Sequence, residues 1–424
     1  MIKKRTLRAI IGLLLLSSFG AFAQLFSTGE RVTLESEVLG ESRQIQVLLP
    51  EGYRAELSSN YPVIYLLDGD YNFHGMSGML DLLANKGQLI PKVILVGLAD
   101  KGTEQYRKYM TPNDSSSPLK ENKGAATEFL AFLNQEVQPY IQQHYRTAEQ
   151  SILVGHSIGG LFVLNSLLNA PNSFDNYVAI SPSVWVSDNA IVEQAKSKIK
   201  GLKTQDNGIG LYLSLGDEMQ MGQYAFINEL DIAAPKNIDW HFKHYPDENH
   251  NSVGLIALRD SLKLIFKDWY LAEKYLEKMQ PTKTLDYYAE AMKSLDIQQS
   301  IPAGVVHIML RQHYRQNKAD QVAGFIDGAI KRFPASKLVL VTKFASFIGY
   351  YDSQDAALSY LKGYENDFAE SVDYFKALAG TYEQLKQDKQ AKRYYQKALA
   401  LAEQQNANLW LLNILRAKVN GIST

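Results

Sequence analysis

Ser157 lies at the centre of the segment ILVGHSIGG (152–160), with Gly155 and Gly159 two residues away on either side. An apolar run with strand character precedes the serine, and a segment with helical character follows it. A serine on such a strand–turn–helix junction stands at the tip of the turn, where it can attack an ester carbonyl. A Walker loop does not fit, because Leu161 stands where that loop needs lysine. The segment therefore predicts a catalytic nucleophile, with a purely structural turn as the alternative.

A nucleophilic serine needs a base and an orienting carboxylate, which follow it in the chain order serine, acid, histidine. Of the eight histidines, His250 lies in the loop PDENHNS (246–252), after the last predicted strand, where an imidazole can reach the serine. The acid should follow the strand GIGLYLSLG (208–216), where Asp217 and Glu218 stand side by side. We expect Glu218 to be the acid, with Asp217 as the alternative.

Ester hydrolysis passes through a tetrahedral intermediate whose negative oxygen needs two backbone donors, together called the oxyanion hole. The amide directly after the nucleophile, that of Ile158, is the first candidate. The second should come from the turn that follows the strand YPVIYLLDG (61–69). In that turn we expect the amide of Asp70 to be the donor.

The composition is that of a globular protein with apolar cores, because 46% of the 424 residues are hydrophobic and 21% are charged. This length suggests two or three domains. The formal net charge of −1 and the absence of any block of like charge give no electrostatic reason to expect a nucleic acid partner. The chain has no cysteine, which excludes disulfides, thiolate metal sites and a cysteine nucleophile.

Residues 1–23 predict a signal peptide. A basic start is followed by the apolar run IIGLLLL and by Ala21-Phe22-Ala23, a pattern of small residues typical of signal peptidase sites. The apolar run is about half as long as the ~20 residues that span a bilayer, so an uncleaved anchor is the weaker interpretation. We therefore expect a periplasmic or secreted protein with no membrane span after cleavage.

The chain from residue 30 to 250 alternates strand-like and helix-like segments, which predicts an α/β fold with a doubly wound, mostly parallel sheet. We expect the first two strands to pair antiparallel. Amphipathic helices are expected at 122–145, at about 159–169 and at about 252–276. The strands are expected at 30–38, 43–50, 61–69, 91–99, 150–155, 174–181, 208–216 and 238–246.

Beyond Pro281 the pattern changes to helix, short turn, helix, which predicts an α/β domain over 24–277 and an all-α domain over 283–424. Small and aromatic residues recur there at the spacing of tetratricopeptide (TPR) helical hairpins, so we predict a TPR-like array. An irregular helical bundle is the alternative. The residues at this spacing are Leu378, Ala379, Tyr382, Ala391, Tyr395 and Ala398, and, in an earlier copy with a one-residue deletion, Tyr314, Val322, Ile326, Ala329 and Pro334. The segment between the two copies resembles a third, looser hairpin.

The first 250 residues resemble the esterase D and enterochelin-esterase-like branch of the α/β-hydrolases, which includes feruloyl esterase domains and mycolyltransferases. The segments that carry the resemblance are YLLDGDYNF (65–73), EQYRKYMTPN (104–113), GHSIGG (155–160), AISPSVWV (179–186) and ENHNS (248–252). The resemblance implies an α/β-hydrolase fold and serine ester hydrolysis with no cofactor and no metal. It also implies that the segment after Asp68-Gly69 lines the substrate pocket, so we expect Tyr71, His156 and Trp185 to be pocket residues.

These observations favour an exported serine esterase that acts on a small-molecule or glycan ester, such as a siderophore lactone or an acyl or aryl ester. An acyltransferase that uses the same residues is one alternative. Another is an inactive hydrolase domain that serves as scaffold, while the helical domain binds a protein partner.

Overall fold

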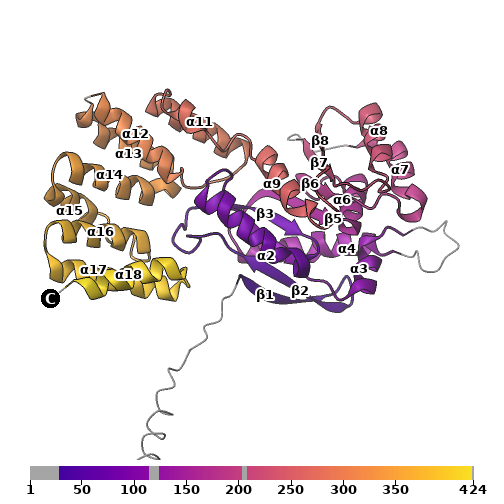
Figure 1. Ribbon diagram of the computed structural model, residues 1–424, viewed down its shortest axis with the longest axis horizontal. Helices are drawn as coiled ribbons and strands as arrows, with labels where there is room; N and C mark the ends of the chain where they lie inside the picture. Colours follow the sequence, from indigo (N-terminus) through magenta and orange to yellow (C-terminus); the bar gives the residue numbers. More distant parts are fainter. Residues whose placement is uncertain (1–27, 114–123, 203–207, 317, 423–424) are drawn as a thin grey trace, which may run out of the picture.

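The computed structural model describes residues 28–113, 124–202, 208–316 and 318–422 (Figure 1). The predicted signal peptide over residues 1–23 lies outside these ranges. A twisted sheet with helices on its two faces occupies the N-terminal half, and a row of helical hairpins extends from one side of it (Figure 1). The chain thus combines an α/β half with a C-terminal all-helical region, as the sequence predicts.

The sheet has eight strands in the order β1-β2-β4-β3-β5-β6-β7-β8. β1 pairs antiparallel with β2, as predicted, and β2 pairs antiparallel with β4, while all other pairs are parallel. Parallel neighbours end at the same edge, so the turns after β3, β5, β6, β7 and β8 gather there. The strands are β1 (Glu30–Ser36), β2 (Glu41–Leu48), β3 (Tyr61–Leu66), β4 (Ile94–Leu98), β5 (Thr147–His156), β6 (Asn176–Ile180), β7 (Ile209–Leu215) and β8 (Ile238–His244).

Every residue of β3, β4, β6 and β7 is buried, as expected for apolar strands covered on both faces. One apolar cluster joins the sheet to α3–α8, and a second joins the opposite face to α2 and α9. These helices are α2 (Gly69–Leu80), α3 (Thr103–Met110), α4 (Ala126–Phe132), α5 (Gln138–His144), α6 (Ile158–Asn169), α7 (Val186–Lys198), α8 (Gln223–Ala233) and α9 (Val253–Ile265). Shorter pieces are the π-helices η1 (Asp81–Lys86) and η3 (Leu133–Val137) and the 3₁₀ turn η4 (Ile199–Gly201).

The helix expected over about 252–276 is wrong in its second half. α9 ends at Ile265, and only the short helix α10 (Glu273–Leu276) follows. Phe266 and Trp269 are both almost fully buried, and the Trp269 amide donates to the Phe266 carbonyl in a tight turn. The chain therefore leaves the helix at Phe266 and continues as a turn, while both side chains stay in the apolar core.

The C-terminal half is helical throughout its described residues after Pro281, with the hairpins α14–α15 and α16–α17 packed side by side. Leu378, Ala379, Ala391 and Ala398, expected at a hairpin contact, are completely buried. Their assignment to the TPR class stays a prediction. The helices are α11 (Pro281–Ser294), α12 (Ala303–Arg315), α13 (Val322–Arg332), α14 (Lys337–Tyr351), α15 (Gln354–Lys362), α16 (Val372–Gln384), α17 (Asp388–Gln404) and α18 (Leu409–Gly421), with 3₁₀ turns η5 (Ala319–Gln321) and η6 (Pro334–Ser336).

The two halves share one apolar core across the predicted boundary. The cluster that covers α2 and α9 continues into α11–α14, and the Trp269 and Tyr288 rings meet edge to face at 5.7 Å. Backbone groups are joined as well: the Lys92 amide donates to the Gln299 side chain at 2.9 Å, and that side chain donates to the Lys92 carbonyl at 2.7 Å. The first helices of the array therefore support the sheet side of the molecule directly.

Within the part of the chain that the structure describes, no helix is long and apolar enough to cross a membrane. The same residues contain no group of three or more histidine, aspartate or glutamate side chains that could hold a metal ion.

Because the core is shared, replacing Tyr288 by alanine should destabilise both halves together, by about 3–5 kcal/mol as for other buried aromatic residues. Urea unfolding followed by limited proteolysis should show fragments from both halves appearing at the same, lower urea concentration. Tyr382→Ala is the matched control, because Tyr382 lies in a separate C-terminal cluster, and it should release only the last helices. If the N-terminal half of Tyr288→Ala resisted proteolysis up to the same urea concentration as in wild type, that result would contradict the shared core.

Candidate active site

Ser157 occupies a strained turn between the central strand β5 and helix α6. Its backbone has φ +58° and ψ −117°, a conformation that costs of order 1–3 kcal/mol for a residue with a side chain. The turn closes only over glycines, since a Cβ on Gly155 would lie 2.3 Å from the Gly159 carbonyl oxygen. The sequence expectation of a serine at the tip of a strand–turn–helix junction therefore agrees with the local geometry.

His250 and Glu218 meet at the same edge of the sheet. His250 Nδ1 lies 2.5 Å from Glu218 Oε1, and the Ser181 hydroxyl donates to the other carboxylate oxygen at 3.4 Å. The neighbouring Asp217 has an exposed side chain, and its amide donates to the Glu248 carbonyl at 2.8 Å. Of the two acids weighed from sequence, Glu218 is thus the one in contact with the imidazole.

The surroundings of Glu218 favour its charged form. Burial by itself raises the pKa of this carboxyl, but the hydrogen bonds from His250, from its own amide and from Ser181 outweigh that effect, so the pKa is lowered from its ordinary value. A carboxylate in this position can accept the Nδ1 proton of His250 and so direct the other ring nitrogen toward a substrate.

His156, expected to line a substrate pocket, packs its ring against His250 with the ring centroids 4.5 Å apart. Burial and the nearby charge of His250 lower the pKa of His156 to about 4, so it is neutral near pH 7. Its Nε2 atom is buried and has no hydrogen-bond partner among the described residues. His156 is therefore a direct neighbour of His250, the candidate base.

Sequence reasoning missed two serines in the loop after β6. The Ser183 hydroxyl lies 3.3 Å from the Ser157 hydroxyl, and the Ser183 amide donates to the Ser157 carbonyl at 2.9 Å. Ser181, fully buried, donates to Glu218 and accepts from the Gly216 amide at 3.2 Å. Both belong to the segment AISPSVWV (179–186), which runs from the end of β6 into the following loop. Its position at the end of a parallel strand was the signal from which the two serines could have been found.

The turn after β3 brings Asp68 and Asp70 to this edge. Asp68 has φ +57° and precedes α2, so the first amides of that helix, including that of Asp70, have no carbonyl partner within the helix. The Asp70 carboxylate is held by Gln46 at 3.1 Å, by the Asp100 amide at 3.1 Å and by Arg31 at 3.2 Å. These contacts fix the direction of the backbone at the expected second oxyanion donor.

Large apolar side chains stand exposed on three of the loops that meet here. Tyr71, in the first turn of α2, is 88% exposed, and Trp185, at the start of α7, is 49% exposed. Met219, which directly follows Glu218 and was not expected at the site, is 97% exposed. The segments at this edge therefore carry aromatic and thioether surface that is open to solvent.

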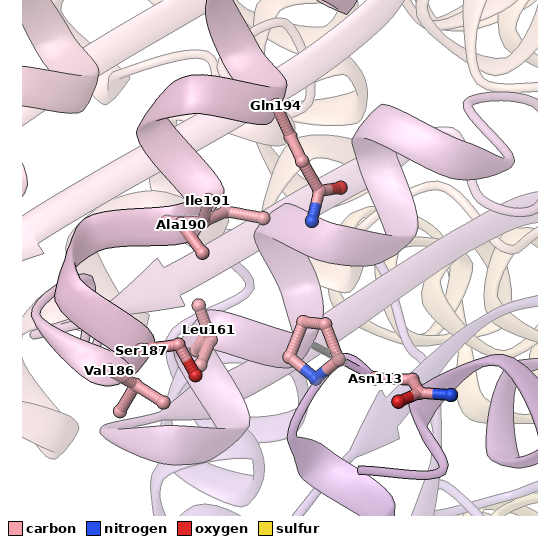
Figure 2. A pocket seen from close by; sticks show the side chains of 8 residues that line it. Asn113, Leu161, Val186, Ser187, Ala190, Ile191 and Gln194 are labelled. Atoms are coloured by element: carbon pink, nitrogen blue, oxygen red, sulfur yellow. The ribbon is translucent and has the colours of Figure 1, made fainter. Parts of the chain in front are cut away.

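A small cavity of about 60 Å³ lies beside the first turn of α6, between that helix and α7 (Figure 2). The start of α7 is strained, since Ser187, Asp188 and Asn189 all have φ between +52° and +61°. None of the expected pocket residues Tyr71, His156 and Trp185 lines it. The lining residues are Pro112, Asn113, Leu161, Val186, Ser187, Ala190, Ile191 and Gln194.

The sheet order, the serine turn and the helices on both faces define an α/β-hydrolase fold. Residues 36–253 match the family model described as "Putative esterase", which covers just over half of the chain. The chain therefore belongs to this esterase family, a class of hydrolases that act on ester bonds.

Two relatives match most of their own length. The ferri-bacillibactin esterase BesA of Bacillus subtilis (strain 168) is 26% identical over 248 residues, which cover 53% of this chain and 85% of that protein. The siderophore triacetylfusarinine C esterase of Aspergillus fumigatus is 26% identical over 280 residues, or 57% and 94% of the two chains.

Two solved structures extend the comparison. An IroE-like serine hydrolase from Shewanella oneidensis aligns with a TM-score of 0.57 and 26% identity, over 73% of this chain and 98% of that one. An uncharacterised protein from Capnocytophaga ochracea aligns over 93% and 99% of the two chains, with a TM-score of 0.54 and 18% identity. The second likeness shows the fold alone, with sheet and helical array in one chain.

The buried Asp68 carboxyl yields a prediction about stability and pH. Burial raises the pKa of Asp68 to about 7, so between pH 4 and 7 the folded chain holds a proton that the unfolded chain releases. Asp68 therefore makes stability fall as the pH rises through this window. Asp68→Asn, which cannot ionise, should raise the thermal midpoint relative to wild type more at pH 8 than at pH 5. An equal shift at both pH values, measured by differential scanning fluorimetry, would contradict the assignment.

Proposed function

We propose that the chain is an exported serine esterase in which Ser157 is the nucleophile, His250 the general base and Glu218 the orienting acid. The observation that carries the proposal is the 2.5 Å contact of His250 Nδ1 with Glu218 Oε1 at the edge where the strained Ser157 turn stands. Serine, acid and histidine also follow one another in the chain order of α/β-hydrolases.

In this mechanism His250 takes the proton of the Ser157 hydroxyl as the oxygen attacks the ester carbonyl. Glu218 stabilises the resulting imidazolium through Nδ1. The amides of Ile158 and Asp70 hold the negative oxygen of the tetrahedral intermediate. His250 then protonates the leaving alcohol, and water, deprotonated by His250, hydrolyses the acyl-enzyme and frees Ser157.

The substrate we propose is an ester with an aromatic or apolar part, with a siderophore ester as first choice. The exposed side chains of Tyr71, Trp185 and Met219 suit such a molecule, because aromatic rings stack on it and methionine adapts to its shape. The names of the relatives, which include siderophore esterases, support the same choice. Aryl esters and glycan esters belong in the same assay panel.

Export is proposed from the basic and apolar pattern of residues 1–23. We also propose that the helical array, next to the esterase half, offers a surface to a protein partner. Cell fractionation should find the mature protein, lacking these residues, in the periplasm or the medium. Retention of the full-length chain in the cytoplasm would contradict export.

A fluorophosphonate probe tests the nucleophile. Purified wild type should be labelled and should hydrolyse p-nitrophenyl butyrate, and Ser157→Ala should lose labelling and about 10⁴-fold or more of the activity. Ser183→Ala is the matched control, because Ser183 lies beside Ser157 yet has no proposed covalent role, and it should still be labelled. Folded wild type that neither reacts with the probe nor cleaves any ester of the panel would refute the proposal.

Replacing the two adjacent acids tests the triad. Glu218→Gln keeps the shape but removes the charge that holds His250, so kcat should fall by about 10²–10⁴-fold. Asp217→Asn should stay within about threefold of wild type, because its side chain is exposed and surface changes have small effects. Steady-state kinetics on one ester decide between them, and the opposite ranking would make Asp217 the acid.

A further inference from the structure

We propose that Tyr106 is a positioning residue that holds together the two turns of the oxyanion hole, an inference that rests on the proposed function. Tyr106 lies on α3 and belongs to neither turn. Its hydroxyl lies beside the Asp68 carboxyl and the backbone of Gly159, close enough to influence the pKa of Asp68 and to have its own pKa influenced by both groups. Asp68 precedes the turn that presents the Asp70 amide, and Gly159 follows the Ile158 amide, so one hydroxyl links both donors.

The three groups meet at one point. A Cβ placed on Gly159 would lie 3.1 Å from the Tyr106 hydroxyl and 3.1 Å from Asp68 Oδ2. The absence of a side chain at Gly159 is therefore what allows the hydroxyl and the carboxyl to reach the first turn of α6. Burial and the adjacent Asp68 raise the pKa of Tyr106 far above its ordinary range, so the hydroxyl keeps its proton and can donate it to Asp68.

The direction of the hydrogen bonds fits the proposed role. The Tyr106 hydroxyl, which keeps its proton, is placed to donate to Asp68. The Gly159 amide, one of the first amides of α6 that lack a carbonyl partner within the helix, is placed to donate to the same hydroxyl. With the Gly159 amide engaged in this way, the Ile158 amide is the one left to face an oxyanion beside Ser157.

The bridge also controls a competing charge. The Asp68 carboxyl is buried, and its Oδ2 atom lies next to Gly159, the residue that follows the proposed donor Ile158. If the Tyr106 hydroxyl were removed, this buried carboxyl would need another donor, and the unpaired backbone amides of the two turns are candidates. A carboxylate that occupied them would block the oxyanion, so we infer that Tyr106 keeps Asp68 away from the donors as well as fixing their spacing.

Tyr106→Phe in the full-length protein tests the inference, with Tyr109→Phe as the matched control. Tyr109 is a buried tyrosine on the same helix, but the group that acts on its hydroxyl is Glu41, and its ring faces Arg43. Tyr106→Phe should lower kcat for p-nitrophenyl butyrate by about 10–100-fold while KM stays within about threefold, because misplaced donors act on the transition state. The rate of fluorophosphonate labelling should fall by the same factor, and Tyr109→Phe should change neither.

A second pair of variants covers the case in which Tyr106→Phe does not fold. Asp68→Asn can still accept the Tyr106 hydrogen bond and should keep kcat within about fivefold, whereas Asp68→Ala removes the acceptor and should reproduce the loss expected for Tyr106→Phe. Wild-type kcat and labelling in Tyr106→Phe or in Asp68→Ala would overturn the inference while leaving the serine esterase proposal intact. A wild-type protein without labelling or activity would overturn both.

Discussion

The sharp turn at Ser157 is the constraint on which the site depends. The central strand β5 must reverse into α6 within one residue, at a φ of +58°, and this is possible only because Gly155 and Gly159 leave room for each other's backbone. The turn is held from the neighbouring strand, since the Ser157 amide donates to the Ile180 carbonyl at 2.9 Å and the Ser183 amide donates to the Ser157 carbonyl. The strain is thus balanced by backbone hydrogen bonds on both sides of the serine.

The rest of the molecule holds the other groups around this turn. Parallel pairing of β5 through β8 ends four strands at one edge, which brings the loops of Glu218 and His250 to the serine. Helix α2 begins at the turn proposed to supply an oxyanion donor, and α9 begins just after His250. The apolar faces of both helices pack into the core shared with α11–α14. The helical array is therefore joined to the elements that support the site, whatever else it binds.

The sequence predicts all eight strands and points to Ser157, Glu218 and His250, because strands buried on both faces leave long apolar runs and because hydrolases place their groups after successive strands. It does not predict the end of α9 at Ile265, since burial of Phe266 and Trp269 depends on packing against α11. The sequence also does not predict that Tyr106 lies beside Asp68 or that His156 contacts His250. Such contacts join segments far apart in the chain and leave no local pattern.

The most direct test of the account is a crystal structure of the full-length protein after reaction with a phosphonate ester. The account predicts one covalent bond from phosphorus to the Ser157 oxygen, with the phosphoryl oxygen within about 3.1 Å of the amides of Ile158 and Asp70. His250 should remain bound to Glu218 in that adduct. A phosphonate attached to another residue, or a phosphoryl oxygen directed away from both amides, would contradict the proposed mechanism.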